Sequence, residues 1–361
     1  MPAYASCDFP LVNKWKNLAD QNSIIGFFDS VLSSFGQIAF SDNPLSGALI
    51  IIACFIGSPI QIISSIWSTV IAIITAMFLG VSNPLIRQGL YGFNAALAGL
   101  AIPLFIFPGQ GFTPMLFIYT GIGAICCVIF TAAISYFFSK LDLPPLALPY
   151  SITLLVILPG TTLFKGLNSL PTTVPRLIEY SNQPWLSFTI KEFFLAFSTG
   201  IAQVIWQTSL ISGIIYLIAI LLSSRIDGAS AVIAAVISTF IAIVFKLPKE
   251  SIMMGIYSYN SVLLFQVIFG RGFVMSAYSF GLSVFLAALV TIFSASLSIV
   301  FAPLGAAVSG FPYSVLGILA LLSKGAFKNL SYVSPKKWGV PETIYKYREQ
   351  QKKLNHNIDI S

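Results

Sequence analysis

The sequence predicts an all-α polytopic membrane protein, and two observations carry that prediction. Only 9% of the 361 residues are charged and 57% are hydrophobic, whereas soluble domains are about 25% charged. The charges are also clustered, since residues 43–86, 88–139 and 272–323 contain no Asp, Glu, Lys or Arg. A bilayer-spanning helix needs about 20 apolar residues, so each of these stretches is long enough for two or more spans. A large soluble enzyme is excluded.

Hydropathy alone divides the chain into candidate segments that Pro or Gly often interrupts. In order they are 23–40, 45–56, 60–80, 88–107, 115–138, 146–164, 193–222, 229–245, 252–270, 273–302 and 310–323. Several are too short for a full crossing. Short, interrupted segments in matching places of two halves are typical of transporter binding sites, so an internal repeat is expected.

A repeat is present, and three paired motifs carry it in the same order. Gln37 pairs with Gln203 at an offset of 166 residues. The same offset pairs residues 89–97 with 255–263, where Gly, Tyr, Asn and Leu are identical. A third pair sets residues 147–150 against 310–313, each with a Pro-Tyr ending. The order and number of these matches indicate duplication.

The repeat divides the chain into five parts. We expect a polar N-terminal segment (1–22), a first membrane repeat (23–164), a linker (165–192), a second repeat (193–323) and a basic cytoplasmic tail (324–361). From Lys324 onward there are eight basic and three acidic residues, which marks a cytoplasmic flank rather than a nucleic-acid site. An odd number of crossings per half predicts inverted halves with both termini inside, and an even number predicts a parallel repeat.

Cofactor chemistry finds little support in the composition. The four cysteines lack metal-ligand spacing, the single His356 lies in the polar tail, and no phosphate-binding loop motif occurs. The first 22 residues show no signal-peptide pattern. We therefore expect no cofactor, no metal site, no nucleic-acid partner and no enzymatic activity.

The motifs resemble those of a known family. Residues 36–47 and 89–101 resemble the first two conserved stretches of the urea transporter family, and 141–150 lies where its Leu-Pro-x-x-Thr-x-Pro-Phe signature belongs. The resemblance covers about residues 30–325 and is stronger in the first half. It implies an inverted repeat of about ten transmembrane helices plus two tilted half-membrane helices, with a central pore in each subunit of a homotrimer. It also implies a plasma membrane location, here the bacterial inner membrane.

The same resemblance implies a set of residues that line the path of the solute. They come as pairs from the two halves: Gln37 and Gln203, Phe40 and Trp206, Phe93 and Tyr259, Asn94 and Asn260, Leu97 and Leu263, and, at the signature Thr, Ala147 and Gly310. The sequence departs from the family at this last pair, and the signature Phe is Tyr150 in one half and Tyr313 in the other.

Each pair has a functional and a structural interpretation. A Gln amide offers both an acceptor and donors to a neutral polar solute, or it ties two helices together. Paired aromatic rings form a slot for a flat molecule, or they only pack. Asn94 and Asn260 are more consistent with caps of interrupted helices than with solute contact. Replacement of Thr by Ala147 and Gly310 is expected to widen the centre, unless nearby hydroxyls compensate.

The few charged residues near the spans are expected at boundaries and in loops. Arg87 and Arg271 are interpreted as boundary residues, and no Asp or Glu is expected deep in a span. Since ion-coupled transport usually needs a buried carboxylate, this pattern argues against coupling to protons or sodium.

The function predicted is facilitative, channel-like transport of urea or a closely related small neutral solute across a lipid bilayer. The alternative keeps the scaffold and gives it a larger polar or amphipathic metabolite, because both signature Thr are lost. A membrane scaffold or sensor without flux is a third, weaker interpretation.

Overall fold

The computed structural model describes residues 10–106, 111–164 and 187–358, and all regular secondary structure in these ranges is helical. The first run of helices is α1 (Pro10–Gln21), α2 (Ser23–Gly36), η1 (Gln37–Ala39), α3 (Pro44–Gly57), α4 (Pro59–Phe78), α5 (Asn83–Arg87), α6 (Phe93–Ile106), α7 (Pro114–Ser139), α8 (Leu148–Ile157) and η2 (Pro159–Leu163). The second run is α9 (Ile190–Ala202), η4 (Gln203–Ile205), α10 (Leu210–Ser223), α11 (Arg225–Val244), α12 (Lys249–Met253), α13 (Tyr259–Ile268), α14 (Ala277–Phe301), η5 (Ala302–Leu304) and α15 (Phe311–Leu322). The tail adds η6 (Pro335–Lys337) and α16 (Pro341–Ile358). Most of the predicted linker, residues 165–186, and residues 1–9 of the predicted N-terminal segment lie outside the described residues.

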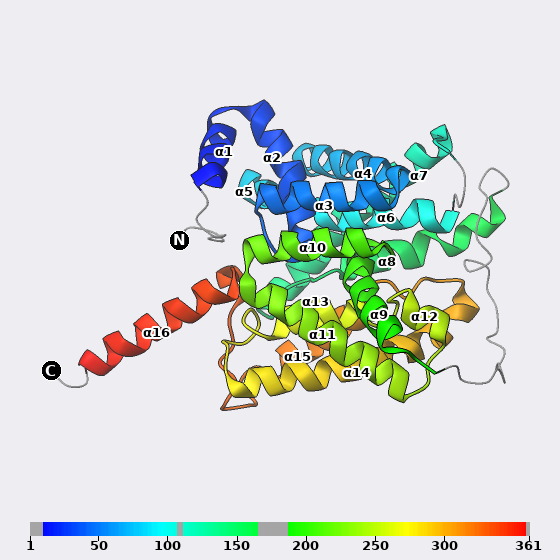
Figure 1. The fold of residues 1–361 in the computed structure, drawn as a ribbon. Helices are drawn as coiled ribbons and strands as arrows, with labels where there is room; N and C mark the ends of the chain where they lie inside the picture. The colour runs from blue at the N-terminus through cyan, green and yellow to red at the C-terminus, as the bar shows by residue number, and fades with distance from the viewer. Residues whose placement is uncertain (1–9, 107–110, 165–186, 359–361) are drawn as a thin grey trace.

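The two runs lie side by side, with α3 of the first against α10 of the second (Figure 1). Two hydrogen bonds cross this contact reciprocally: Ser46 Oγ donates to the carbonyl of Ala219 over 2.8 Å, and Ser212 Oγ donates to the carbonyl of Ala53 over 2.8 Å. Because the two donors and the two acceptors are each equivalent in the repeat, the contact is self-complementary, as in an isologous interface. The short Ser hydroxyls also satisfy buried carbonyls without separating the helices.

Helix starts follow local sequence. Asn43 caps α3 by accepting from the backbone N–H of Leu45, with Pro44 at the first helical position. Thr189 and Glu192 form a reciprocal capping box at α9. Both arrangements satisfy amide donors that a helix leaves unpaired at its N-terminus.

Each run contains one sharp bend at an aromatic residue. The helix pair Ser23–Ala39 and Pro44–Gly57 bends by 77°, and the pair Ile190–Ile205 and Leu210–Ser223 bends by 67°. Phe40 (φ 54°) and Trp206 (φ 57°) sit at these breaks in the left-handed region, which is rare for bulky residues. The break ends the preceding 3₁₀ turn and places both aromatic rings at equivalent points of the two halves.

Two glycines of the repeated block are required by close packing. Gly89 (φ 76°) and Gly255 (φ 75°) have positive φ, and a Cβ on either would lie 2.5 Å from backbone atoms of α2 or α9. Only glycine combines this conformation with so close an approach.

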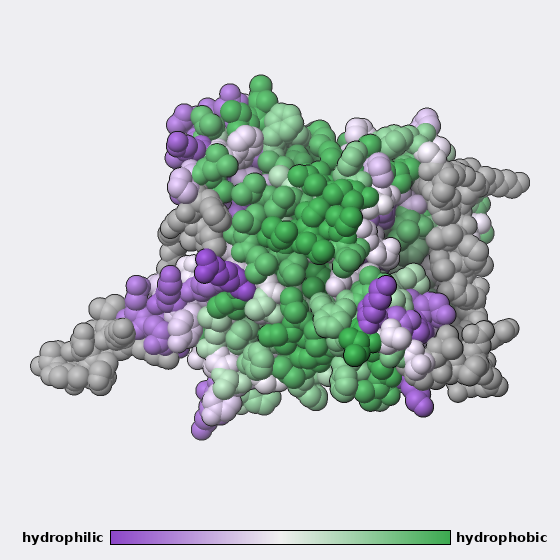
Figure 2. Space-filling model, in the orientation of Figure 1, coloured by the Kyte–Doolittle hydropathy of each residue, from purple (hydrophilic) through white to green (hydrophobic). Residues whose placement is uncertain are grey.

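Four helices are long and apolar enough to cross a membrane: α4, α7, α11 and α14 with η5 (Ala277–Leu304), or six spans if each bent pair counts as one. Four shorter apolar segments accompany them in the described residues: Phe93–Ile106, Leu148–Leu163, Tyr259–Ile268 and Phe311–Leu322. On the face that Figure 2 shows, hydrophobic side chains cover the middle and hydrophilic side chains gather towards the left and right ends. These features fit a polytopic membrane protein, and the predicted count of ten crossings stays a prediction.

Candidate functional site

Ten of the twelve predicted path residues line two cavities that share part of their lining. The larger, of about 940 Å³, is lined by Gln37, Phe40, Phe93 and Leu97 of the first half, and by residues of the tail. The smaller cavity has a volume of about 20 Å³ and is lined mainly by second-half residues. They are Gln203, Val204, Trp206, Tyr259, Leu263, Gly310 and Tyr313, and the first half adds Leu97, Ala147 and Tyr150. Leu97, Val204, Leu263 and Tyr313 line both cavities. These shared side chains separate a wide mouth from a closed centre.

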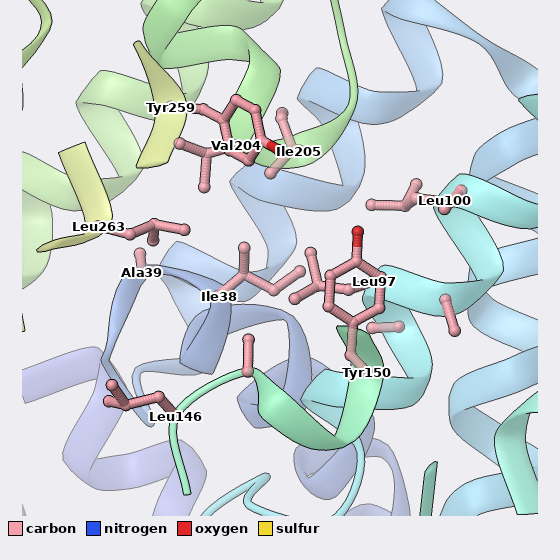
Figure 3. Packing of buried hydrophobic residues seen from close by; sticks show 14 of the residues in the cluster. Ile38, Ala39, Leu97, Leu100, Leu146, Tyr150, Val204, Ile205, Tyr259 and Leu263 are labelled. Atoms are coloured by element: carbon pink, nitrogen blue, oxygen red, sulfur yellow. The ribbon is translucent and has the colours of Figure 1, made fainter. Parts of the chain in front are cut away.

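The closed centre is built from both halves, as Figure 3 shows for Leu97, Tyr150, Val204, Tyr259 and Leu263. A volume of about 20 Å³ has room for about one water molecule. The structure therefore has a constriction at the point where the sequence predicts the middle of the path.

The expected widening at Ala147 and Gly310 is not present. A Cβ built on Gly310 lies 3.5 Å from the Cβ of Ala147, so the two positions face each other across the centre. The same Cβ lies only 3.0 Å from Cε1 of Tyr313. The Tyr313 ring therefore occupies the neighbouring space, and the loss of two Thr side chains leaves no open chamber here.

Hydroxyl groups are abundant around this centre. Trp206 Nε1 donates to the Tyr150 hydroxyl over 2.8 Å, and the Tyr259 hydroxyl donates to the carbonyl of Ser309. The hydroxyls of Ser151 and Ser309 are buried without a hydrogen-bond partner among the described residues. The centre thus keeps polar atoms even though the signature Thr is absent.

The two predicted glutamines differ in how they are used. Each is only 9% exposed. Gln37 donates from Nε2 to the carbonyl of Gln88 over 2.8 Å, and so is tied to the chain before the repeated block. The carbonyl oxygen of Gln203 is buried and has no partner among the described residues. Since an unpaired buried acceptor is costly, Gln203 is the stronger candidate for solute contact.

Asn94 and Asn260 act as caps in the structure. Ala147 and Gly310 are the N-cap residues of α8 and α15, and neither supplies a capping side chain. Instead, Asn94 accepts from the backbone N–H of Tyr150 over 3.3 Å, and Asn260 accepts from that of Tyr313 over 3.4 Å. Both amides are fully buried and line neither cavity. The capping interpretation is confirmed, and direct solute contact by these two residues stays a prediction.

Phe40 and Trp206, the aromatic residues at the two breaks, pack against different kinds of side chain. The Arg271 guanidinium lies over the Phe40 ring, 5.1 Å from its centroid. The equivalent support of Trp206 is Phe105, edge-on, with ring centroids 5.4 Å apart. In each case the supporting residue comes from the other half of the chain.

Arg271 is buried inside the protein, and its interpretation as a membrane-boundary residue stays a prediction. It is 1% exposed and forms a two-point ion pair with Asp227, with N–O distances of 2.5 and 2.6 Å. In the first half the residues equivalent to Asp227 and Arg271 are Gln61 and Phe105. Gln61 Oε1 instead accepts from Nε2 of Gln207, a residue of the second half, over 3.1 Å. In the hydropathy pattern Arg271 is an isolated charge beside an apolar run, and the pattern does not show that it pairs with Asp227, 44 residues earlier.

Two acids are also buried inside the protein, and the expectation that no acid lies deep in a span stays a prediction. Asp227 is 1% exposed, and Asp29, within α2, is fully buried. Asp29 pairs with Lys16 over 3.1 Å and with Arg87 over 3.2 Å. Arg87 therefore neutralises a buried carboxylate. Since both acids are paired with bases, their burial is explained by structure.

Sequence reasoning missed the contribution of the tail to the large cavity. Its lining includes Tyr332, Trp338, Ile344 and Tyr347. The only sequence signal was the presence of aromatic residues in an otherwise polar, basic segment. The tail was interpreted as a flank, although it forms a wall of the site.

The fold indicates a multi-pass membrane protein, in which residues of both runs of helices line the same two cavities. The family described as "Urea transporter" matches residues 28–331. The chain is 28% identical to urea transporter 1 of Ovis aries over 320 residues, which is 88% of this chain and 82% of the relative. It is 29% identical to urea transporter 1 of Rattus norvegicus over 265 residues, 72% of this chain and 67% of the relative. The chain belongs to the urea transporter family, which is a family of transporters and not of enzymes.

Proposed function

We propose that this chain is a facilitative, channel-like transporter of urea or a closely related small neutral solute. The observation that carries the proposal is the convergence of equivalent residues from both halves on one small central cavity, beside a buried and unpaired Gln203 carbonyl. The named activity of the relatives supports the same substrate.

The polar atoms at the centre match the needs of an amide solute. Urea must exchange its hydrogen bonds to water for others, since an unpaired polar group in an apolar path costs a few kcal/mol. The Gln203 carbonyl is an acceptor for a solute N–H. The Tyr150 hydroxyl already accepts from Trp206, which leaves its own hydrogen for the solute carbonyl.

Passage requires the constriction to open. The central cavity of about 20 Å³ is smaller than a urea molecule, so the Leu97 and Leu263 side chains change rotamer as the solute passes. Both leucines are buried, each 7% exposed, so a change of rotamer also displaces the side chains packed around them.

A larger solute is the alternative, and it rests on the small residues Ala147 and Gly310. The contact of Tyr313 with the Gly310 position weighs against it, because the volume released by the lost Thr is already filled. Urea and its small analogues therefore remain the first candidates.

The same proposal includes topology and assembly. Helices α8 and α15, of 10 and 12 residues, extend about 15–18 Å and so reach about half the hydrocarbon core; we assign them as the two tilted half-membrane helices. The reciprocal α3–α10 contact supports an inverted repeat. Because α1 and α16 lie at one end of the molecule (Figure 1), both termini are assigned to the cytoplasm of a bacterial inner-membrane protein. A homotrimer completes the proposal.

Flux of labelled solutes into proteoliposomes tests the function and its alternative together. Urea uptake is expected to exceed that of empty vesicles without any ion gradient, and uptake of a bulkier neutral solute, N,N′-diethylurea, is expected to stay at the background. Urea uptake equal to that of empty vesicles overturns the proposal, and faster uptake of the bulkier solute favours the alternative.

A further inference from the structure

The wall of the large cavity carries positive charge only. Its lining contains four basic residues, Arg271, Lys336, Lys337 and Arg348, and no Asp or Glu among the described residues that line it. Three of the four come from the tail. Hydrophilic side chains of this end of the chain gather beside the start of α16 (Figure 2). A cavity with walls of one sign concentrates the field inside it.

Hydrogen bonds to both halves of the protein hold the tail over the cavity. Val333 donates its backbone N–H to the carbonyl of Gly272 over 2.9 Å, and Ser334 Oγ donates to a carboxylate oxygen of Asp142 over 2.6 Å. Tyr332 donates to the carbonyl of Asp142. Burial, together with the nearby Asp142 charge, raises the pKa of Tyr332 well above its usual range, so this donor keeps its proton. The segment that carries the charges is therefore positioned.

Helix α16 is anchored in the same way. Glu342 accepts from the Ser224 hydroxyl over 2.8 Å and from the backbone N–H of Ile226 over 3.1 Å, at the N-terminus of α11. Residues 343, 344, 347 and 348 line the cavity, and this spacing places them on one face of the helix. Arg348 is thus turned to the cavity with its neighbours.

Arg271 acts on cations in another way. Its own charge is balanced by Asp227, which does not line the cavity. Its guanidinium occupies one face of the Phe40 ring. The ring faces are where aromatic residues attract cations, so a second cation gains less from Phe40 at this mouth.

We propose that the tail charges and Arg271 form an electrostatic filter that admits neutral urea-like solutes and rejects cations of the same shape, such as guanidinium. The inference rests on the proposed function and assigns its selectivity. At about 10 Å in water, each tail charge reduces the local concentration of a monovalent cation by about twofold. Three charges together reduce it by about tenfold at low salt, and screening removes most of this effect near 1 M.

The first test compares flux of guanidinium and urea, which are both planar and nearly equal in size. The variant Lys336→Gln, Lys337→Gln, Arg348→Gln removes the lining charges. The control Lys140→Gln, Lys328→Gln, Lys346→Gln removes the same net charge at residues that do not line the cavity. At low salt the guanidinium-to-urea ratio is expected to rise about tenfold in the lining variant and to stay unchanged in the control. Equal ratios in the two variants overturn the filter.

A second measurement does not depend on urea flux. A cysteine introduced at Ser135, which lines the cavity, is labelled with an anionic and a cationic thiol reagent of equal size, and labelling of the parent chain is subtracted. The anionic reagent is expected to react faster, and the lining variant is expected to lose that advantage. An unchanged reagent ratio overturns the filter, whereas absent urea flux with a changed ratio overturns the proposed function only.

Discussion

The two halves share a backbone plan and differ in the side chains around the path. Both have a bend at an aromatic residue in the left-handed region, a capping Asn and a reciprocal Ser contact. Yet Gln37 is tied to a backbone carbonyl at a wide cavity, whereas Gln203 keeps an unpaired carbonyl at the closed centre. The contacts that position the helices are alike in the two halves, and the side chains that line the cavities differ.

The support behind the aromatic residues shows the same divergence more strongly. Phe40 rests against a buried ion pair, Arg271 with Asp227, whereas Trp206 rests against the neutral ring of Phe105. Gln61, the residue equivalent to Asp227, accepts from the neutral amide of Gln207. Asp227 and Gln61 therefore hold equivalent positions, one paired with a cation and the other with a neutral donor.

The largest expected effect comes from leaving one member of the ion pair alone. Arg271→Met leaves Asp227 buried and unpaired, which costs about 3–5 kcal/mol of unfolding free energy. Gln207→Met, which removes the neutral partner of Gln61, costs about 1–3 kcal/mol, because only a neutral acceptor is left. Denaturant unfolding in detergent measures both. Equal losses for the two variants would show that the charge buried at Asp227 has no special structural weight.

The next effect tests the closed centre. Gly310→Thr places a Cβ 3.0 Å from the Tyr313 ring, which costs about 1–3 kcal/mol of stability by overpacking. The added side chain also narrows the path, and a barrier raised by about 1.4 kcal/mol lowers urea flux by about tenfold. Gly281→Thr is the control, since no atom lies within 4 Å of the added Cβ. Full urea flux through Gly310→Thr would mean that the solute does not pass this point.

A smaller effect separates the two glutamines. Gln203→Leu removes the free acceptor and is expected to lower urea flux by about tenfold, in line with one hydrogen bond of about 1–1.5 kcal/mol. Gln37→Leu is expected to lower flux by less than half that factor, because its amide serves the backbone of Gln88. The comparison uses proteoliposomes with equal protein content, and a larger loss in Gln37→Leu reverses the assignment.

The smallest effect is expected where the halves agree. Asn94→Ala and Asn260→Ala each remove the cap of a short helix, at a cost of about 0.5–2 kcal/mol. Because the two caps have the same geometry, the losses in unfolding free energy are expected to match within about 0.5 kcal/mol. A clear difference would show that the two caps contribute unequally to stability although their geometry is the same.

Much of the fold was predictable because hydropathy and the repeat act over many residues. Apolar runs without charge give the spans, and paired blocks give the correspondence of the halves. The left-handed conformation of Phe40 and Trp206 was not predictable, because bulky residues rarely adopt it and no glycine marks the break.

The sequence was sufficient to predict which positions lie near the cavities, and it was not sufficient to predict which side chains contact one another there. Motif positions named residues such as Leu97 and Gln203, which the structure brings together at the central cavity, and their contact with a solute stays a prediction. The partner of Arg271, the space taken by Tyr313 and the tail wall depend on residues that meet only in three dimensions. The sequence shows that a charged or aromatic residue is present, and it does not show which residue contacts it in the folded chain.

The most direct test of the account is urea flux through the wild-type chain in proteoliposomes, measured across urea concentrations with no ion gradient. The account predicts flux well above that of empty vesicles, rising in proportion to concentration. Flux equal to that of empty vesicles, or flux that appears only with a proton or sodium gradient, would contradict it.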